Sequence, residues 1–446
     1  MTSRPNILLL ISDDHRWDVL GALGHQDVRT PHLDALAREG VLFSHLHCMG
    51  SCVPAVCMPA RAMLHTGRNL FRIPREMTYD ANCPAPSPSN LADTLLLGEV
   101  LRASGYESYH VGKWHNGRES LRRSYDGGDA IFLGGMCSHY AVPCHPWDPE
   151  GVYSRDTERV SHRHSDDIFS GSAVQFLVSR ESAAPFYLQV AFTSPHDPRM
   201  ARPPFRDLYH PEMIAIPPNC LPAPAFDNGA LQIRDELIEP APRSEDAVRK
   251  HLADYYGMVS GLDDAIGQVL LALDHCGARE NTLVIYVSDH GLSLGQHGLM
   301  GKQNLYDHAI RAPLILSGAN LPRGEISDAL CYHFDVFATI LEAAGLSQPS
   351  GTDGVSLFRA LEPGPYWPRQ DVRGYYRECQ TMIKSHAAKI IRYHVNGESR
   401  EERFDLATDP WEMRNLFNIE NPETLRPELA GELSKLAEYG FEGIPS

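Results

Sequence analysis

Short apolar runs in this chain end at clusters of polar residues, and stretches with a longer hydrophobic period separate them. Four such runs, each with the polar residues that follow it, are 7–11 before Asp13 and Asp14, 107–111 before Lys113 and His115, 186–192 before His196, and 283–287 before Asp289 and His290. Between them, 91–103 and 254–273 carry apolar residues every three or four positions, as amphipathic helices do. Strands that alternate with helices predict an α/β fold with a large, mostly parallel sheet sandwiched by helices.

The four polar clusters are expected to meet at one edge of that sheet. In open parallel sheets, ligands bind beyond the carboxyl ends of the strands, and each cluster follows a strand. Thr30 as N-cap and Pro31 at the first helical position predict a further helix that ends before Gly40. Proline-rich stretches indicate surface loops of the kind that shape a substrate mouth, at 83–88, 195–204, 217–224 and 240–242.

The pattern of predicted elements changes near residue 365, which predicts a catalytic α/β domain over 1–365 and a small C-terminal α+β subdomain over 366–446. In the second part, Asn396-Gly397 predicts a turn between two antiparallel strands. Asp409 and Glu412 have the spacing of an N-cap and the third residue of a helix. Strands are expected at 374–379, 389–395 and 403–406, and a helix at 423–439.

The balance of charge argues against some partners. The 446 residues carry a formal net charge of −17, from 40 basic and 57 acidic residues. Such a chain is a poor partner for nucleic acid, and an anionic substrate would need a local basic cluster. No apolar stretch approaches the roughly 20 residues that span a bilayer, so no membrane partner is expected. The first apolar run is too short for a secretory signal, which predicts a cytoplasmic location, or a periplasmic one if a leader was removed.

Ten cysteines are spread along the chain and do not form the framework of a small disulfide-rich domain. The spacing of Cys48, Cys52 and Cys57 is not a usual zinc pattern. Free thiols are expected, with pairing of Cys48 to Cys52 or of Cys137 to Cys144 left open.

Adjacent carboxylates at a strand end suggest a cation site. Asp13 and Asp14 repel each other unless a cation lies between them, although one of them could instead cap a helix. Asp289 should bring a third carboxylate to the same edge. Three aspartates make a hard oxygen site that suits calcium or magnesium.

Four motifs together resemble a known family. Cys57 begins a C-x-P-x-R pattern that ends at Arg61 and continues to Gly67. The others are G-Y-E-S-Y-H-V-G-K-W-H at 105–115, S-P-H at 194–196, and S-D-H-G at 288–291 with Lys302 downstream. Over nearly the whole chain, these motifs are similar to those of the sulfatases, within the alkaline-phosphatase-like superfamily. The resemblance implies the alkaline-phosphatase-like fold and a hydrolase that acts on sulfuric esters.

The resemblance also implies a modified nucleophile and a metal. In the family, the motif cysteine, here Cys57, is oxidised by a maturation enzyme to 3-oxoalanine (formylglycine). One hydroxyl of the aldehyde hydrate ligates the metal and the other attacks sulfur. Asp13, Asp14, Asp289 and His290 would complete the ligand set, with Ca²⁺ expected and Mg²⁺ or Mn²⁺ possible.

Roles for the remaining motif residues follow from the same resemblance. Arg61, Lys113 and Lys302 would stabilise the sulfate group. His115 would take a proton when the aldehyde is regenerated, and His196, with a pKa near neutrality, would protonate the leaving alcohol. The substrate would be a small-molecule or oligosaccharide sulfate ester, with a sulfated carbohydrate as the leading class.

Two other functions stay open at this stage. The first is a phosphonate monoester hydrolase or phosphodiesterase on the same fold, and the second is a binding protein that kept the scaffold. His297 could line the pocket. Arg199, Arg202 and Arg311 could contact a sugar carboxylate or a second sulfate, although such arginines are more often structural. The sulfated hydroxyl, exo or endo action and the oligomeric state are not specified by these patterns.

Overall fold

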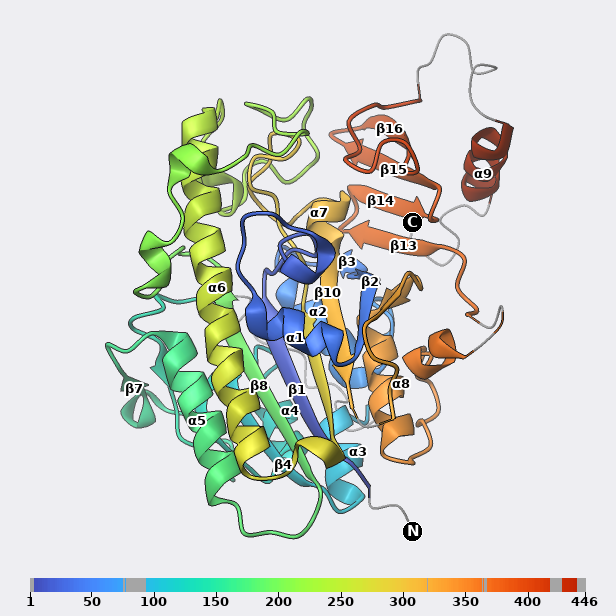
Figure 1. The fold of residues 1–446 in the computed structure, drawn as a ribbon. Coiled ribbons are helices and arrows are strands. Elements are labelled where there is room, and N and C mark those ends of the chain that lie inside the picture. The colour runs from blue at the N-terminus through green and yellow to red at the C-terminus, as the bar shows by residue number, and fades with distance from the viewer. Residues whose placement is uncertain are drawn as a thin grey trace.

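A central sheet of nine strands organises the computed structural model, which describes residues 4–74, 77, 94–318, 320–362, 364, 367–417 and 427–438. Within these residues the strand order is β11-β2-β10-β9-β1-β8-β4-β5, with β12 beside β2 (Figure 1). The strands are β1 (Asn6–Asp13), β2 (Val41–His47), β4 (Glu107–Lys113), β5 (Gly127–Phe132), β8 (Phe186–Pro195), β9 (Thr282–Ser288), β10 (Arg311–Ser317), β11 (Glu325–Ser327) and β12 (Cys331–Tyr332).

The predicted parallel sheet is confirmed in its centre. Strands β9, β1, β8, β4 and β5 run parallel, and β10 is antiparallel to both β9 and β2. The strands predicted from 7–11, 107–111, 186–192 and 283–287 are β1, β4, β8 and β9, which are neighbours in the sheet. Their carboxyl ends therefore lie side by side.

Helices cover both faces of the sheet and bury β1 on both sides. Leu8 and Leu10 pack with α1, α5 and α6, whereas Ile7, Leu9 and Ile11 pack with α3, α4 and α8. In Figure 1, the long α6 runs along the sheet beside α1 and α5. The helices are α1 (Pro31–Arg38), α2 (Cys57–Thr66), α3 (Leu97–Ala103), α4 (Arg118–Ser124), α5 (Ser165–Ser179), α6 (Glu245–His275), α7 (Asp307–Ile310) and α8 (His333–Ala343).

The helix predicted after Thr30 is α1, with Thr30 at its N-cap position, and only the capping hydrogen bond differs from the prediction. Pro31 is at the first helical position, but the Thr30 side chain makes no capping hydrogen bond. Instead, the carboxylate of Asp263 on α6 accepts from the backbone N–H groups of His32 at 3.1 Å and Leu33 at 2.8 Å. A residue distant in sequence thus supplies the capping hydrogen bonds that the sequence pattern assigned to the neighbouring Thr30. The predicted helix over 91–103 is α3, which begins at Leu97; residues 91–93 lie outside the described part.

A second, smaller sheet has the order β16-β15-β14-β13-β3. Its strands are β3 (Gly50–Ser51), β13 (Val372–Tyr376), β14 (Gln380–Lys384), β15 (Ala388–Val395) and β16 (Glu398–Asp405), and α9 (Pro427–Glu438) packs against β15. The expected C-terminal antiparallel sheet with a helix is confirmed, with β14 added between the predicted strands. The boundary at 365/366 stays a prediction. A separate strand pair joins β6 (Pro143–Cys144) to β7 (Arg159–Val160).

The predicted helix start at Asp409 is wrong. Residues 409–417 form turns and irregular structure, and Glu412 has a positive φ of 57°. Glu412 is buried and pairs with Lys389 of β15 at 2.6 Å. The glutamate therefore forms an ion pair with a buried lysine at the junction with the catalytic domain and does not cap a helix.

Buried charges join the two sheets. Asp307 of α7 lies 2.6 Å from Lys384 and 2.9 Å from Lys389 of the small sheet, and 3.1 Å from Arg311 of β10. Burial favours the neutral acid, but these cations outweigh it and hold the pKa of Asp307 well below its usual range. The cysteines among the described residues are free thiols. None of the helices described is long and apolar enough to cross a membrane.

Candidate active site

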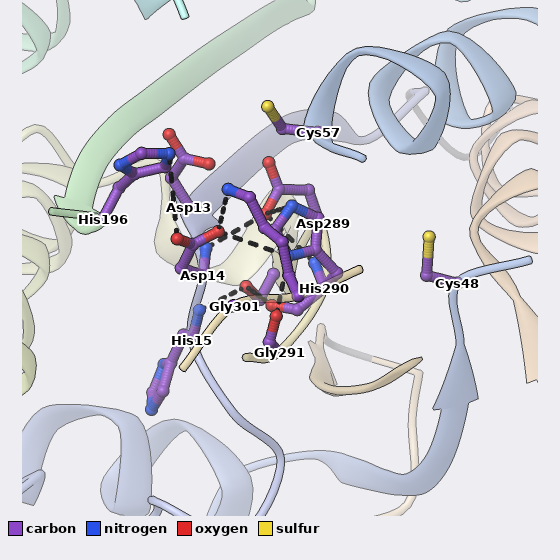
Figure 2. A network of polar contacts seen from close by, with 12 residues as sticks. Asp13, Asp14, His15, Cys48, Cys57, His196, Asp289, His290, Gly291 and Gly301 are labelled. Carbon is purple, nitrogen blue, oxygen red and sulfur yellow. Dashed lines mark hydrogen bonds and ion pairs between the residues drawn. The ribbon is translucent and has the colours of Figure 1, made fainter. Parts of the chain in front are cut away.

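Four neighbouring strands deliver polar side chains to one buried point. Asp13 ends β1, Lys113 ends β4, Asp289 directly follows β9, and His196 directly follows β8. Figure 2 shows Asp13, Asp14, His196, Asp289 and His290 gathered around this point, with the Cys57 sulfur facing them and Cys48 set apart. The strand ends therefore bring together the residues that the sequence predicted to meet at this edge of the sheet.

Three carboxylates and an imidazole form the floor of the site. One ligand atom each of Asp13, Asp14, Asp289 and His290 lies within 4.8 Å of the others, and all four residues are buried. Oδ1 of Asp289 accepts from the backbone N–H groups of Asp14 at 3.1 Å and His290 at 3.0 Å. Oδ1 of Asp13 and Nε2 of His290 are buried and have no hydrogen-bond partner among the residues that the structure describes. Such unsatisfied ligand atoms fit a cation that would complete them.

The backbone of Asp14 is held in an unusual conformation. Its φ is +70°, in the left-handed region that non-glycine residues rarely adopt. The hydroxyl of Tyr255 on α6 donates to the Asp14 carbonyl at 2.6 Å and accepts from the Arg16 N–H at 2.9 Å. Tyr255 thereby helps to hold the backbone of Asp14 in this conformation.

Cys57 begins α2 and faces the carboxylates. Its Sγ lies 3.5 Å from Nδ1 of His115, and it belongs to a group with Asp13 and His290 whose ligand atoms lie within 4.8 Å of one another. The side chain is 4% exposed. Because α2 starts here, its free backbone N–H groups favour negative charge at this position. Pro59 suits the first turn of a helix, in keeping with this position of Cys57.

Three cations lie among the carboxylates. Arg61, one turn along α2, donates from Nε to Asp289 at 3.1 Å and from Nη1 to the Lys113 carbonyl at 3.1 Å. Lys113 Nζ pairs with Asp13, and Lys302 Nζ lies 2.8 Å from Oδ1 of Asp14. Burial alone would raise the pKa of Asp13, but the combined field of the cations, Lys113 first, holds it below its ordinary value.

Gly112 allows Lys113 to reach this point. The glycine has φ +92°, and a Cβ on it would lie 2.1 Å from the carbonyl oxygen of Ala191 in β8. The strand pairing of β4 with β5 also shifts register between Val111 and Gly112. Only a residue without a side chain permits this close approach.

The surroundings shift the pKa values of His290 and His196 in opposite directions. Burial disfavours the charged form of both rings, but Asp289 outweighs burial at His290 and raises its pKa to about 9. At His196, burial and then the charge of Lys302 lower the pKa well below 6.5. The surroundings of His196 therefore shift its pKa below the value near neutrality that was expected for it. His196 Nε2 lies 3.8 Å from Asp14, and its Nδ1 donates to the Asp197 carbonyl at 2.8 Å.

Sequence patterns missed Asp235, a loop residue whose charge acts on this histidine. Asp235 accepts from Gln303 at 2.8 Å and pairs with Arg234 at 2.8 Å, and Arg234 also pairs with Asp197 beside His196. Burial opposes its charge, but Lys302 and the Gln303 hydrogen bond lower the pKa of Asp235. No periodic pattern marks Asp235, because it lies in an irregular loop before α6.

Other candidates lie in structural contacts. Arg202 pairs with Asp167 at 3.1 Å and Asp264 at 2.5 Å. Arg311 pairs with Asp307 and covers the Trp17 ring. His297 stacks on Tyr306 with ring centroids 3.8 Å apart, near the small sheet, and burial lowers its pKa to about 4.

This combination of fold and site defines a class of hydrolase. Carboxylates at neighbouring strand ends of a mostly parallel sheet, with a residue at a helix start facing them, are the arrangement of the alkaline-phosphatase-like enzymes. Comparison with known proteins narrows the class. Residues 5–346 match the Sulfatase family and residues 295–439 match the family described as N-sulphoglucosamine sulphohydrolase, C-terminal. The chain belongs to the sulfatase family.

Individual relatives cover almost the whole chain. An "Ulvan-active sulfatase" of Formosa agariphila is 29% identical over 466 residues, which cover 99% of this chain and 82% of the relative. A structure solved with its substrate D-glucosamine-2-N,6-O-disulfate has a TM-score of 0.77 at 22% identity and covers 98% of this chain and 99% of its own. The phosphonate monoester hydrolase of Agrobacterium radiobacter has a TM-score of 0.72 at 22% identity, with coverages of 98% and 96%. At these identities, the two structures show a shared fold.

Proposed function

We propose that this sulfatase hydrolyses sulfate esters of carbohydrates, with Cys57, oxidised to formylglycine, as the residue that carries the nucleophile. One observation carries the proposal: Cys57 faces Asp13 and His290 from the start of α2, with ligand atoms within 4.8 Å. Because a thiol is a poor nucleophile toward sulfate, a buried cysteine at this point calls for modification. Formylglycine would supply a geminal diol whose hydroxyl attacks sulfur.

The proposed cation site consists of Asp13, Asp14, Asp289 and His290. The unpartnered Oδ1 of Asp13 and Nε2 of His290 are the atoms that a cation would satisfy. Hard carboxylate oxygens favour Ca²⁺, with Mg²⁺ or Mn²⁺ as alternatives. A divalent cation would supply Lewis acidity and stabilise an alkoxide at residue 57.

The basic residues around this point would bind the sulfate oxygens. Arg61 and Lys113 already contact each other, and Lys302 approaches from the side of Asp14. All three are nearly excluded from solvent, with at most 6% of each side chain exposed. Charges in such a dry site act on a bound anion far more strongly than charges at the surface.

Two histidines would transfer protons in the proposed reaction. His115 lies against Cys57 at 3.5 Å and would hold the proton that leaves residue 57. His196, beside Asp14, would face the oxygen of the leaving alcohol. The negative charge of a bound ester would oppose the effect of Lys302 and favour the protonated ring of His196.

A sulfated sugar is the proposed substrate class. The similar protein of known structure was solved with a glucosamine disulfate, and the relative from Formosa agariphila is described as ulvan-active. A phosphonate monoester would fit the same charges, and a phosphonate hydrolase shares the fold. Both esters are monoanions, so charge alone does not distinguish them, and the two reactions are separated by measuring the turnover of each ester.

The test begins with maturation of the protein. The protein is coexpressed with a formylglycine-generating enzyme, and the mass of the peptide that contains Cys57 is measured. We expect an aldehyde there and faster hydrolysis of nitrophenyl sulfate than of nitrophenyl phosphonate. Cys57→Ala is the matched control and should lose turnover. Preference for the phosphonate, or full activity with an unmodified thiol, would contradict the proposal.

A further inference from the structure

Arg199 has hydrogen-bond donors that the described part of the protein does not use. Its Nη1 lies 2.9 Å from Nδ1 of His251, whereas its Nε and Nη2 are buried and have no partner in the described ranges of the chain. Burial lowers the pKa of Arg199 from its ordinary value, although nearby acidic groups favour its charge. A buried guanidinium with unmet donors is costly, because each N–H has lost water without replacing it. The arrangement calls for an acceptor that comes from outside the chain.

The position of Arg199 relates it to the leaving-group side of the site. It follows the proposed acid His196 by three residues, and His196 approaches Asp14 at 3.8 Å. Its partner His251 lies one turn of α6 before Tyr255, whose hydroxyl holds the Asp14 carbonyl. Arg199 is thus tied on both sides to elements that contact Asp14. Because His196 would face the alcohol oxygen, groups next to it would meet the sugar and not the sulfate under attack.

Neighbouring arginines are already neutralised. Arg202 lies between Asp167 and Asp264, and Arg234 lies between Asp197 and Asp235. Arg199 differs from both, since no carboxylate pairs with it among the described residues. Of these three arginines, Arg199 is the one that still has both charge and N–H groups to offer.

We propose that Arg199 binds a second anionic group of the sugar, a carboxylate or a second sulfate, beside the ester that is cleaved. This inference rests on the proposed function. A guanidinium presents its N–H groups in a planar fork that matches two oxygens of such an anion. The substrate would then be an acidic or doubly sulfated saccharide, not a sugar whose single charge is the ester.

The experiment measures binding without turnover. In a Cys57→Ser background, calorimetry compares N-acetylglucosamine 6-O-sulfate with glucosamine N,6-O-disulfate. We expect the disulfate to bind about ten- to a hundredfold more tightly, as one charge-assisted contact allows. Arg199→Gln should abolish this preference, and Arg199→Lys should retain part of it.

The control is Arg206→Gln on the same loop, whose side chain is 61% exposed and pairs with the adjacent Asp207. It should keep the preference of the parent. Thermal melting of each variant separates loss of the contact from loss of the fold. Equal affinity of the parent for the two sugars, binding of neither, or an equal loss for both in Arg199→Gln would overturn the assignment to Arg199. Failure of the proposed function would show separately, as absent turnover of nitrophenyl sulfate by the matured enzyme.

Discussion

Removal of one hydroxyl, in Tyr255→Phe, should disturb the active site without touching a proposed ligand. Tyr255 lies on α6, and its ring is buried against α6 neighbours and the loop after β1. Its hydroxyl donates to the carbonyl of Asp14 at 2.6 Å and accepts from the N–H of Arg16 at 2.9 Å. The variant keeps the ring and loses both hydrogen bonds.

The size of the effect follows from these contacts. Each buried backbone group left without a partner costs about 1–3 kcal/mol. Asp14 also holds φ at +70°, a conformation that costs roughly 1–2 kcal/mol for a residue with a Cβ. The hydroxyl is one of the contacts that maintain that conformation, so we expect a loss of about 2–4 kcal/mol in the free energy of unfolding. A displaced Asp14 carboxylate should also lower kcat/KM at least about tenfold, since small misplacements of reacting groups are expensive.

Two assays check this prediction. Urea denaturation gives the free energy of unfolding, and hydrolysis of nitrophenyl sulfate by matured protein gives kcat/KM. Tyr256→Phe is the matched control, because its hydroxyl lies 3.2 Å from the partly buried His25 and away from Asp14. If Tyr255→Phe unfolds at the same urea concentration as Tyr256→Phe and retains its activity, the proposed role of the hydroxyl is refuted.

Three further predictions concern pH, buried charge and metal. Burial raises the pKa of Asp263 to about 7, so the folded state holds this proton more tightly than the unfolded chain, and stability falls as the pH rises from about 4 to about 7. Asp263→Asn loses one of the two capping hydrogen bonds at every pH but has no such titration, so its stability relative to the wild type should rise by up to about 4 kcal/mol between pH 4 and pH 7, in urea melts at each pH; identical pH profiles would contradict this. Asp307→Asn leaves three buried cations without their carboxylate and should lose about 3–5 kcal/mol in the same assay, whereas the exposed Asp246→Asn should lose none. Treatment with EDTA should abolish hydrolysis of nitrophenyl sulfate and Ca²⁺ should restore it; full activity in EDTA would argue against the cation site.

Much of the site could be predicted because its residues follow strands with an unambiguous pattern. A run such as 7–11 is apolar at every position, as a strand buried on both faces must be, and it ends where the chain becomes polar. The carboxyl ends of parallel strands meet, so Asp13, Lys113, His196 and Asp289 could be assigned to one edge without coordinates. The same holds for the motif at Cys57, whose residues resemble the sulfatase pattern and lie at the start of α2.

Other features depend on contacts that no local pattern records. Tyr255 is one of two adjacent tyrosines on α6, and only the tertiary structure shows that its hydroxyl reaches Asp14. Asp263 replaces Thr30 at the start of α1 in the same way. The error at Glu412 has the same origin, because a capping pattern also suits a carboxylate recruited by a distant Lys389.

The negative net charge of the protein need not prevent an anionic substrate from binding at the site. Charges on the surface are screened over about 8–10 Å, so most of the net −17 is hidden from a group bound within the fold. Inside, Asp13, Asp14 and Asp289 are matched by the buried Arg61, Lys113 and Lys302. A divalent cation added to this balanced set would make it positive, and a sulfate group would then be attracted by charges that water does not weaken. The cation would therefore contribute to binding of the ester as well as to its cleavage. The carboxylates, which by themselves repel sulfate, would promote its binding because they hold the cation.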